Sequence, residues 1–134
     1  MPVFECNCGS IKFEVGSELY DIIFCHCSIC RRFSGGNGIP VIIVNDTDFS
    51  WLSGQNNIKV WRKPDVDWDA NFCATCGSAI PGKNDASSMY IPAGLIPDDA
   101  GNLKVKHHIF VGSKACWDEI GDAGHQYHGR FEHI

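Results

Sequence analysis

The sequence predicts an all-β fold, an antiparallel β-sandwich or barrel-like single domain. Short runs of apolar residues, several of them alternating with polar ones, are separated by turn residues at short intervals. No stretch of ten or more residues keeps the 3.6-residue apolar period of a capped helix, so we expect little helix. Loops rather than crossover helices join the runs, which favours antiparallel over parallel strand pairing.

Three strands are predicted before residue 45. Apolar and charged side chains alternate at residues 11–15, and residues 22–24 form a short apolar run. Residues 39–44 have the composition of a buried strand, and Pro40 near its start indicates an edge or entry position. The N-terminal third of the chain is therefore predicted to contain three strands.

Further strands are predicted along the rest of the chain, at residues 49–52, 58–62, 66–72, 78–80, 89–93 and 105–111. Turn-forming residues lie between several of them, at 53–54, 64–65, 82–85 and 97–102. The last ten residues have no clear period and predict a loosely packed tail. We expect one domain over residues 1–134, with its motifs within about 4–120 and a C-terminal tail at 121–134.

Composition and charge exclude several classes of function. The chain is 44% hydrophobic and 20% charged, which is typical of a folded globular protein. A net charge of -5 argues against nucleic acid as a partner, because phosphate binding rests on clustered Lys and Arg. No apolar stretch reaches the ~18 residues of a membrane span, and the N-terminus does not resemble a signal peptide. We therefore expect a cytoplasmic protein with reduced thiols and no membrane partner, whose oligomeric state has no signature in the sequence.

Seven of the eight cysteines fall into three groups with the spacing of metal ligands. The groups are CxC at Cys6 and Cys8, CxCxxC at Cys25, Cys27 and Cys30, and CxxC at Cys73 and Cys76. Two sulfurs two or three residues apart can bind one tetrahedral zinc ion at ~2.3 Å. Gly77 follows the last group and lets the backbone turn its N–H groups toward the sulfurs.

A closed structural zinc site has four protein ligands, whereas a catalytic site usually has three and one open position. We assign the first and third groups to one structural zinc and name them the four-cysteine cluster: Cys6, Cys8, Cys73 and Cys76. We assign the second group to a catalytic zinc and name it the three-cysteine cluster: Cys25, Cys27 and Cys30. With fewer protein ligands, the second zinc is expected to be the more labile one.

Other interpretations of these cysteines remain open from the residues alone. A CxxC pair can be a redox centre, although such pairs sit at a strand-to-helix turn of a βαβ unit. Both zinc ions can be structural if His26, a later histidine or Cys116 closes the second site. We expect Cys116 to be a packed small apolar residue.

Four segments in the same order resemble the glutathione-dependent formaldehyde-activating enzyme family. They are CNCGSIKFEV at residues 6–15, CHCSICRRFSGG at 25–36, FCATCGS at 72–78 and HHIFVGSKACWDEI at 107–120. The resemblance implies an all-β zinc fold similar to that of a Rab-binding suppressor protein. It also implies a structural zinc on the four-cysteine cluster and a catalytic zinc on the three-cysteine cluster.

The resemblance further implies an activity, the condensation of formaldehyde with glutathione to S-hydroxymethylglutathione by a carbon–sulfur lyase. The expected partners are thus a small-molecule thiol and an aldehyde, or their adduct. The alternative is a non-enzymatic protein-binding module in which both zinc ions are structural. A weaker alternative is a redox or metal-buffering thiol protein. A fourth protein ligand at the three-cysteine cluster would favour the module.

Charged residues beside the three-cysteine cluster are candidates for supporting roles. A substrate thiolate on a three-thiolate zinc gives a net charge of -2, which nearby cations can offset. Arg31 and Arg32 directly follow the last ligand, and we expect one of them, Arg31 in our assignment, to offset this charge or to bind a substrate carboxylate. His26 lies between two ligands and should point away from the metal, as a proton carrier or a structural residue.

Other aromatic residues have less specific signals. His107 and His108 are neighbours on a predicted strand, so their side chains face opposite sides of the sheet and at most one can line a pocket. The tryptophans are expected to be core or sheet-face residues rather than substrate platforms: Trp51, Trp61, Trp68 and Trp117.

Overall fold

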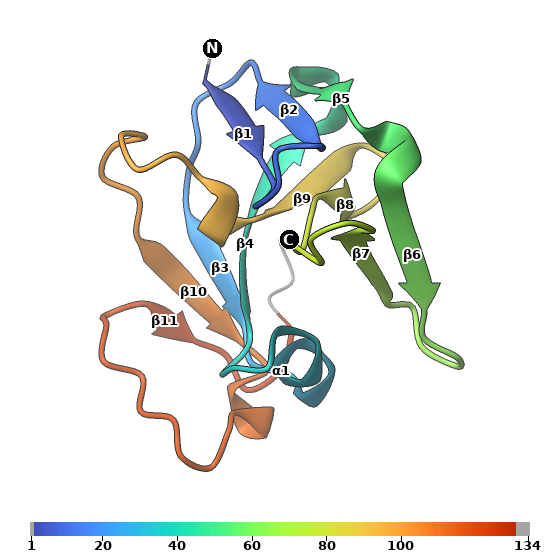
Figure 1. Cartoon of the computed structure of the whole chain (residues 1–134). Coiled ribbons are helices and arrows are strands. Elements are labelled where there is room, and N and C mark those ends of the chain that lie inside the picture. Colours follow the sequence, from blue (N-terminus) through green and yellow to red (C-terminus); the bar gives the residue numbers. More distant parts are fainter. Residues whose placement is uncertain (1, 131–134) are drawn as a thin grey trace.

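The computed structural model describes residues 2–130, and this part of the chain is mostly strand with one α-helix, α1 (Ser28–Ser34) (Figure 1). The strands are β1 (Val3–Glu5), β2 (Lys12–Val15), β3 (Ile22–Cys25), β4 (Ile39–Asn45), β5 (Phe49–Ser53), β6 (Ile58–Arg62), β7 (Asp69–Cys73), β8 (Gly82–Lys83), β9 (Ser88–Pro92), β10 (Val105–Ile109) and β11 (His125–Gln126). Short 3-10 turns lie at Asp46–Asp48, Gln55–Asn57, Ala93–Leu95 and Val111–Ser113. Within the same residues, no helix is long and apolar enough to cross a membrane.

The described strands form three sheets. The largest has the order β11-β10-β3-β4-β9-β8, a smaller one has the order β1-β2-β5, and β6 pairs with β7 as a hairpin. Figure 1 shows the small sheet at one end of the molecule, α1 at the other, and the β6–β7 hairpin to one side. The domain is therefore built around the large sheet, with the hairpin and α1 beside it.

The predicted all-β class is confirmed, but the expected purely antiparallel arrangement is not. Strand β10 pairs in parallel with both β3 and β11, so the large sheet is mixed. Parallel neighbours need a long connection, and the whole segment between β3 and β10 provides it. None of the sheets in residues 2–130 closes into a barrel.

Most predicted strands are present, and the exceptions have local causes. The strand predicted at 66–72 begins later, at Asp69, because Asp65 adopts a turn with φ 67°. The strand predicted to reach residue 111 ends at Ile109, because Phe110 has φ 56° and starts a 3-10 turn. Residues 78–80 form only an isolated bridge between Phe72 and Ala79. The short strands β1, β8 and β11 were not predicted.

The main core lies between the small sheet and the large one. Phe4 and Phe13 stack with ring centroids 4.9 Å apart. The other buried residues of this cluster are Val15, Ile42, Val44, Met89 and Ile91. Trp51 packs against the cluster, with its ring 5.9 Å from that of Phe13, and its predicted core position is confirmed. Burial of these side chains contributes about 1.5–3 kcal/mol each.

Part of the predicted C-terminal tail is hydrogen-bonded to the large sheet. Strand β11 pairs with β10, and the Tyr127 N–H donates to the His108 carbonyl at 2.8 Å. The Phe110 N–H donates to the Gly129 carbonyl at 2.9 Å. Residues 125–129 therefore follow the edge of β10, while residues 131–134 of the predicted tail lie outside the described residues.

We predict that Gly38→Ala destabilises the domain, because Gly38 lies where β4 meets the end of β3. Its φ is 145°, and an added Cβ would lie 2.1 Å from the carbonyl oxygen of Cys25. Strain of this kind costs on the order of 1–3 kcal/mol before the clash is counted. Chemical denaturation of the zinc-replete protein measures the loss of unfolding free energy.

Gly36→Ala is the matched control, two residues earlier in the same loop. Its Cβ would have its nearest neighbour, Ser34 Oγ, at 3.6 Å, an ordinary contact. We expect a change below about 1 kcal/mol. Equal unfolding free energies for the two variants would contradict the close approach of Gly38 to Cys25.

Candidate metal centre

The four-cysteine cluster is assembled from two distant parts of the chain. Its four sulfurs lie within 4.8 Å of one another. The Cys8 sulfur is 3.7 Å from that of Cys6 and 3.7 Å from that of Cys73. A tetrahedral ion with Zn–S bonds of ~2.3 Å requires sulfurs about 3.8 Å apart. The sulfur positions thus fit a single four-coordinate zinc.

Two tight turns bring these sulfurs together. After β1 the chain reverses at Gly9, which has φ 77°, and the Gly9 N–H donates to the Cys6 carbonyl at 3.0 Å. After β7 the chain reverses at Gly77, which has φ 76° and donates its N–H to the Cys73 carbonyl at 2.8 Å. Both are left-handed conformations that favour glycine, as expected for Gly77.

Polar groups surround the sulfurs of the four-cysteine cluster. The Ser10 hydroxyl oxygen lies 3.5 Å from the Cys73 sulfur, and that of Ser78 lies 3.2 Å from the Cys76 sulfur. The hydrogen bond from Ser78 lowers the pKa of the Cys76 thiol to about 5, and that from Ser10 lowers the pKa of Cys73. These groups favour the thiolates that a metal requires.

The three-cysteine cluster lies where β3 ends and α1 begins. Its three sulfurs lie within 4.8 Å of one another, with those of Cys25 and Cys30 3.3 Å apart. Cys27 is the N-cap of α1, and its sulfur accepts a hydrogen bond from the Cys30 N–H at 3.3 Å. Gly35 ends the helix with φ 73° and donates its N–H to the Arg31 carbonyl. The helix therefore holds Cys27 and Cys30 one turn apart, facing Cys25.

Crowding of the three sulfurs separates their protonation states. Hydrogen bonding with Cys25 and Cys30 lowers the pKa of Cys27 to about 2. The hydrogen bond with Cys27 raises the pKa of Cys25 to about 11. The pKa of Cys30 is also raised, chiefly by its hydrogen bond with Cys25. One thiolate is thus favoured and two thiols hold their protons, because the thiolate accepts the hydrogen bonds that the neighbouring thiols donate. A soft divalent cation would compensate three thiolates, so the donor set fits zinc.

No fourth protein ligand joins the three-cysteine cluster among residues 2–130. His26 is bonded elsewhere, as described below. Cys116 is exposed, which corrects the expectation that it is a packed apolar residue. In the turn that follows residues 111–113, the neighbouring Ala115 is buried, and the Cys116 side chain is exposed to solvent.

A buried chain of polar side chains starts beside the three-cysteine cluster. His26 Nε2 is 2.8 Å from His108 Nδ1, and His108 Nε2 is 2.8 Å from the Asp122 carboxylate. Both imidazoles are buried, and the pKa of His26 is lowered mainly by its burial. The hydrogen bond from His108 lowers the pKa of Asp122. Burial thus favours the neutral form of His26, and the hydrogen bond favours the ionised form of Asp122.

This hydrogen-bond order is compatible with two neutral rings. In that pair of tautomers the Asp122 carboxylate accepts from His108 Nε2–H, and His108 Nδ1 accepts from His26 Nε2–H. His26 Nδ1 then carries a lone pair. It has no hydrogen-bond partner and lies 3.6 Å from the Asp118 carboxylate. The sequence predicted that only one of His107 and His108 faces inward, and the inward one is His108, while His107 contacts Tyr127.

The two arginines after the cluster lie in different surroundings. Arg31 donates its Nε–H to the Ser113 carbonyl at 3.2 Å, which holds its side chain against the 3-10 turn at residues 111–113. Arg32 instead lines a pocket. The predicted role of Arg31 beside the metal therefore stays a prediction.

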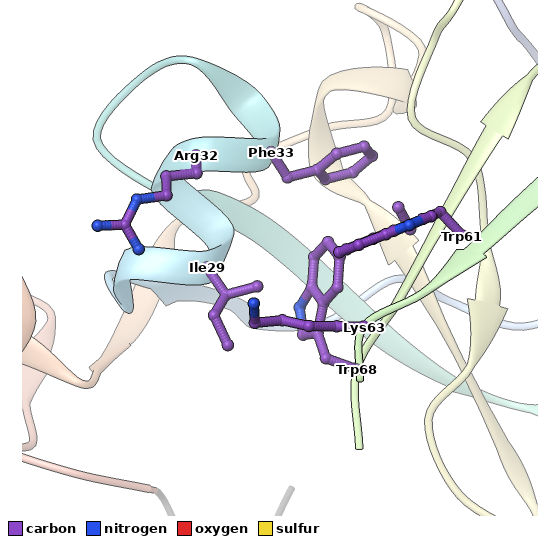
Figure 2. Close-up of a pocket in the computed structure, with 7 residues that line it drawn as sticks. Ile29, Arg32, Phe33, Trp61, Lys63 and Trp68 are labelled. Atoms are coloured by element: carbon purple, nitrogen blue, oxygen red, sulfur yellow. The ribbon is translucent and has the colours of Figure 1, made fainter. Parts of the chain in front are cut away.

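Sequence reasoning missed this pocket, which has a volume of about 230 Å³ between α1 and the β6–β7 hairpin (Figure 2). Its lining residues are Ile29, Arg32, Phe33, Trp61, Lys63, Trp68 and Ala70. Two of the tryptophans that we expected to be core or sheet-face residues thus line a cavity, and Trp61 is 51% exposed. The only sign of this pocket in the sequence is the clustering of aromatic and basic residues at 61–68.

Comparison with known proteins agrees with the motifs. The chain is 27% identical over 126 residues to a Halomonas elongata protein described as a "Putative glutathione-dependent formaldehyde-activating enzyme", covering 87% of this chain and 78% of that protein. The crystal structure of a Rhodobacter sphaeroides protein shares the fold, with a TM-score of 0.55 at 19% identity, covering 76% of this chain and 97% of the other. The family model for the glutathione-dependent formaldehyde-activating enzyme matches residues 1–113. The chain therefore belongs to the glutathione-dependent formaldehyde-activating enzyme family.

Proposed function

We propose that this protein is a zinc-dependent carbon–sulfur lyase that forms or cleaves the adduct of a thiol with formaldehyde, such as S-hydroxymethylglutathione. One observation carries the proposal: three cysteine sulfurs converge at one point without a fourth protein ligand in the described residues. This arrangement is typical of a catalytic rather than a structural zinc. Membership of the family supports glutathione and formaldehyde as the substrates.

The two clusters would divide the metal-binding roles. The four-cysteine cluster would hold a structural zinc, and the three-cysteine cluster would hold a catalytic one. A zinc ion bound there would lower the pKa of a substrate thiol and fix its sulfur. The likeness to the Rab-binding suppressor fold remains a prediction from sequence.

In the synthetic direction the substrate sulfur forms a bond to the carbonyl carbon of formaldehyde, and the thiol proton ends on the new hydroxyl oxygen. The residues of this chain would assist in two ways. The Cys30 N–H, directed at the Cys27 sulfur, stabilises negative charge on the ligands. His26, whose buried Nδ1 has no hydrogen-bond partner among the described residues, is our candidate to hold the proton during transfer.

Arg31 is proposed to offset the negative charge that a fourth thiolate would bring. Its hydrogen bond to the Ser113 carbonyl holds the guanidinium against the 3-10 turn at residues 111–113. A fixed cation in this position acts over a short distance and needs no direct contact with the metal. This role would appear in the rate of the reaction rather than in the number of bound metal ions.

The protein-binding module has less support than the enzyme. It requires a protein side chain to close the three-cysteine cluster, and neither His26 nor Cys116 belongs to the cluster in the structure. The CxCxxC segment does meet a short helix, but in a mixed β-sheet rather than a βαβ unit, so a redox role is not favoured either.

We predict that Cys27→Ser abolishes turnover, because it removes one of three ligands. The fold should stay intact, because a serine side chain can cap the helix in place of the Cys27 sulfur. The rate of exchange between formaldehyde and its glutathione adduct, measured by NMR at equilibrium, should fall to the uncatalysed rate. Circular dichroism should remain that of the unmodified protein.

Cys116→Ser is the matched control, because Cys116 is exposed and belongs to neither cluster. It should keep the full exchange rate. Retention of activity in Cys27→Ser would contradict the proposed catalytic cluster, and so would an unmodified zinc-replete protein that does not accelerate the exchange.

The two clusters should differ in their effect on stability. Native mass spectrometry is expected to find two zinc ions per chain, and one in Cys27→Ser. Cys73→Ser should lose the structural zinc and unfold wholly or partly, since structural zinc contributes on the order of 10 kcal/mol in small domains. Cys76→Ser tests the same cluster at a less buried position. A thermal midpoint unchanged in both variants would contradict the structural assignment.

A further inference from the structure

We propose that the pocket between α1 and the β6–β7 hairpin binds the glycine-end carboxylate of glutathione, and so orients the thiol toward the three-cysteine cluster. This inference rests on the proposed function and adds a substrate-binding site to it. Three features of the pocket support it: its charge, its aromatic walls and its place on the helix.

The charge of the pocket is complementary to an anion. Lys63 contributes a cation among the aromatic rings, Arg32 also lines the pocket but directs its guanidinium away from these rings (Figure 2), and none of the residues described along its wall is acidic. The glycine end of glutathione carries a single negative charge. The glutamyl end carries an ammonium group besides its carboxylate, and would require an acidic partner that this wall does not provide. The pocket therefore favours the glycine end.

The aromatic walls can receive the planar amide that precedes this carboxylate. Trp68 and Phe33 meet edge to face, with ring centroids 5.4 Å apart. The Lys63 ammonium lies 6.0 Å from the centre of the Trp61 ring, which keeps this cation beside an apolar surface rather than free in solvent. Figure 2 shows Lys63 reaching from the hairpin toward Ile29 on the helix, beside the Trp68 ring.

The pocket is within reach of the three-cysteine cluster. Ile29, the residue before Cys30, lines the pocket. Phe33, about one helical turn after Cys30, lines it too. Side chains one turn apart on a helix are about 5–6 Å from each other at Cβ. The cysteinyl-glycine portion of glutathione spans about 7 Å when extended. A sulfur at the cluster and a carboxylate in the pocket can therefore belong to one molecule.

Binding of S-methylglutathione tests the site without requiring catalysis, because a thioether has no thiol to ionise. Isothermal titration calorimetry on the zinc-replete protein should show binding, and the glycine-end methyl ester of the same compound should bind about tenfold more weakly. Lys63→Gln should reduce affinity for the acid by a similar factor while leaving that for the ester nearly unchanged.

Arg62→Gln is the matched control. Arg62 is the neighbour of Lys63 and carries the same charge, but it is exposed and pairs with Asp69 at 3.3 Å instead of lining the pocket. It should change affinity by less than about twofold, because an exposed charge outside the site contributes little. Equal losses in the two variants would overturn the pocket and indicate only a general effect of charge.

The results for the pocket and for the reaction can be separated. Acid and ester binding equally well, or no binding of S-methylglutathione, would overturn the pocket even if the protein accelerates formaldehyde exchange. Carboxylate-dependent binding that is lost in Lys63→Gln would support the pocket even if no acceleration is found. Binding without acceleration would contradict the proposed reaction and support the glutathione-binding site.

Discussion

The convergence of cysteine sulfurs is the constraint on which the rest of the structure depends. The four-cysteine cluster joins the turn after β1 to the turn after β7, with the Cys8 and Cys73 sulfurs 3.7 Å apart. A metal bound there would fasten the small sheet to the β6–β7 hairpin, and a two-stranded hairpin has little stability of its own. Ile11 and Ile80 are buried against these cysteines, which makes the cluster part of a second small core. The proposed cysteine ligation would thus stabilise the same junction as the apolar packing.

The mixed sheet gives the other cluster its surroundings. Because β3 and β10 are parallel neighbours, residues at their ends lie side by side, and the His26 N–H donates to the Ile109 carbonyl at 2.9 Å. The same pairing places His26 within hydrogen-bond distance of His108. Two buried imidazoles would be costly without partners, and the Asp122 carboxylate at the surface completes the chain. The hydrogen-bonded chain holds the backbone between Cys25 and Cys27 in one conformation.

Sequence reasoning succeeded where the signal was local. Cysteine spacing predicted both clusters, and alternating apolar residues predicted most strands. It missed α1 because the helix has seven residues and is capped by a cysteine sulfur rather than by Ser, Thr, Asp or Asn. It missed the parallel pairing of β10 with β3, and hence the contact between His26 and His108, because pairing across 82 residues leaves no local pattern. The pocket was missed for the same reason, since its walls come from two separate elements.

The position of α1 explains how so small a domain could serve both the proposed metal site and the proposed substrate pocket. Cys27 and Cys30 place two sulfurs at the start of the helix. Ile29, Arg32 and Phe33, on the same helix, line the pocket between the helix and the hairpin. A seven-residue helix has little intrinsic stability, so its geometry depends on what it contacts. Ligation of the two cysteines would fix one side of the helix, and contact of Phe33 with Trp68 fixes another. Because Cys73 lies at the end of the hairpin and within the four-cysteine cluster, loss of the proposed structural metal would disturb the pocket wall as well as the fold.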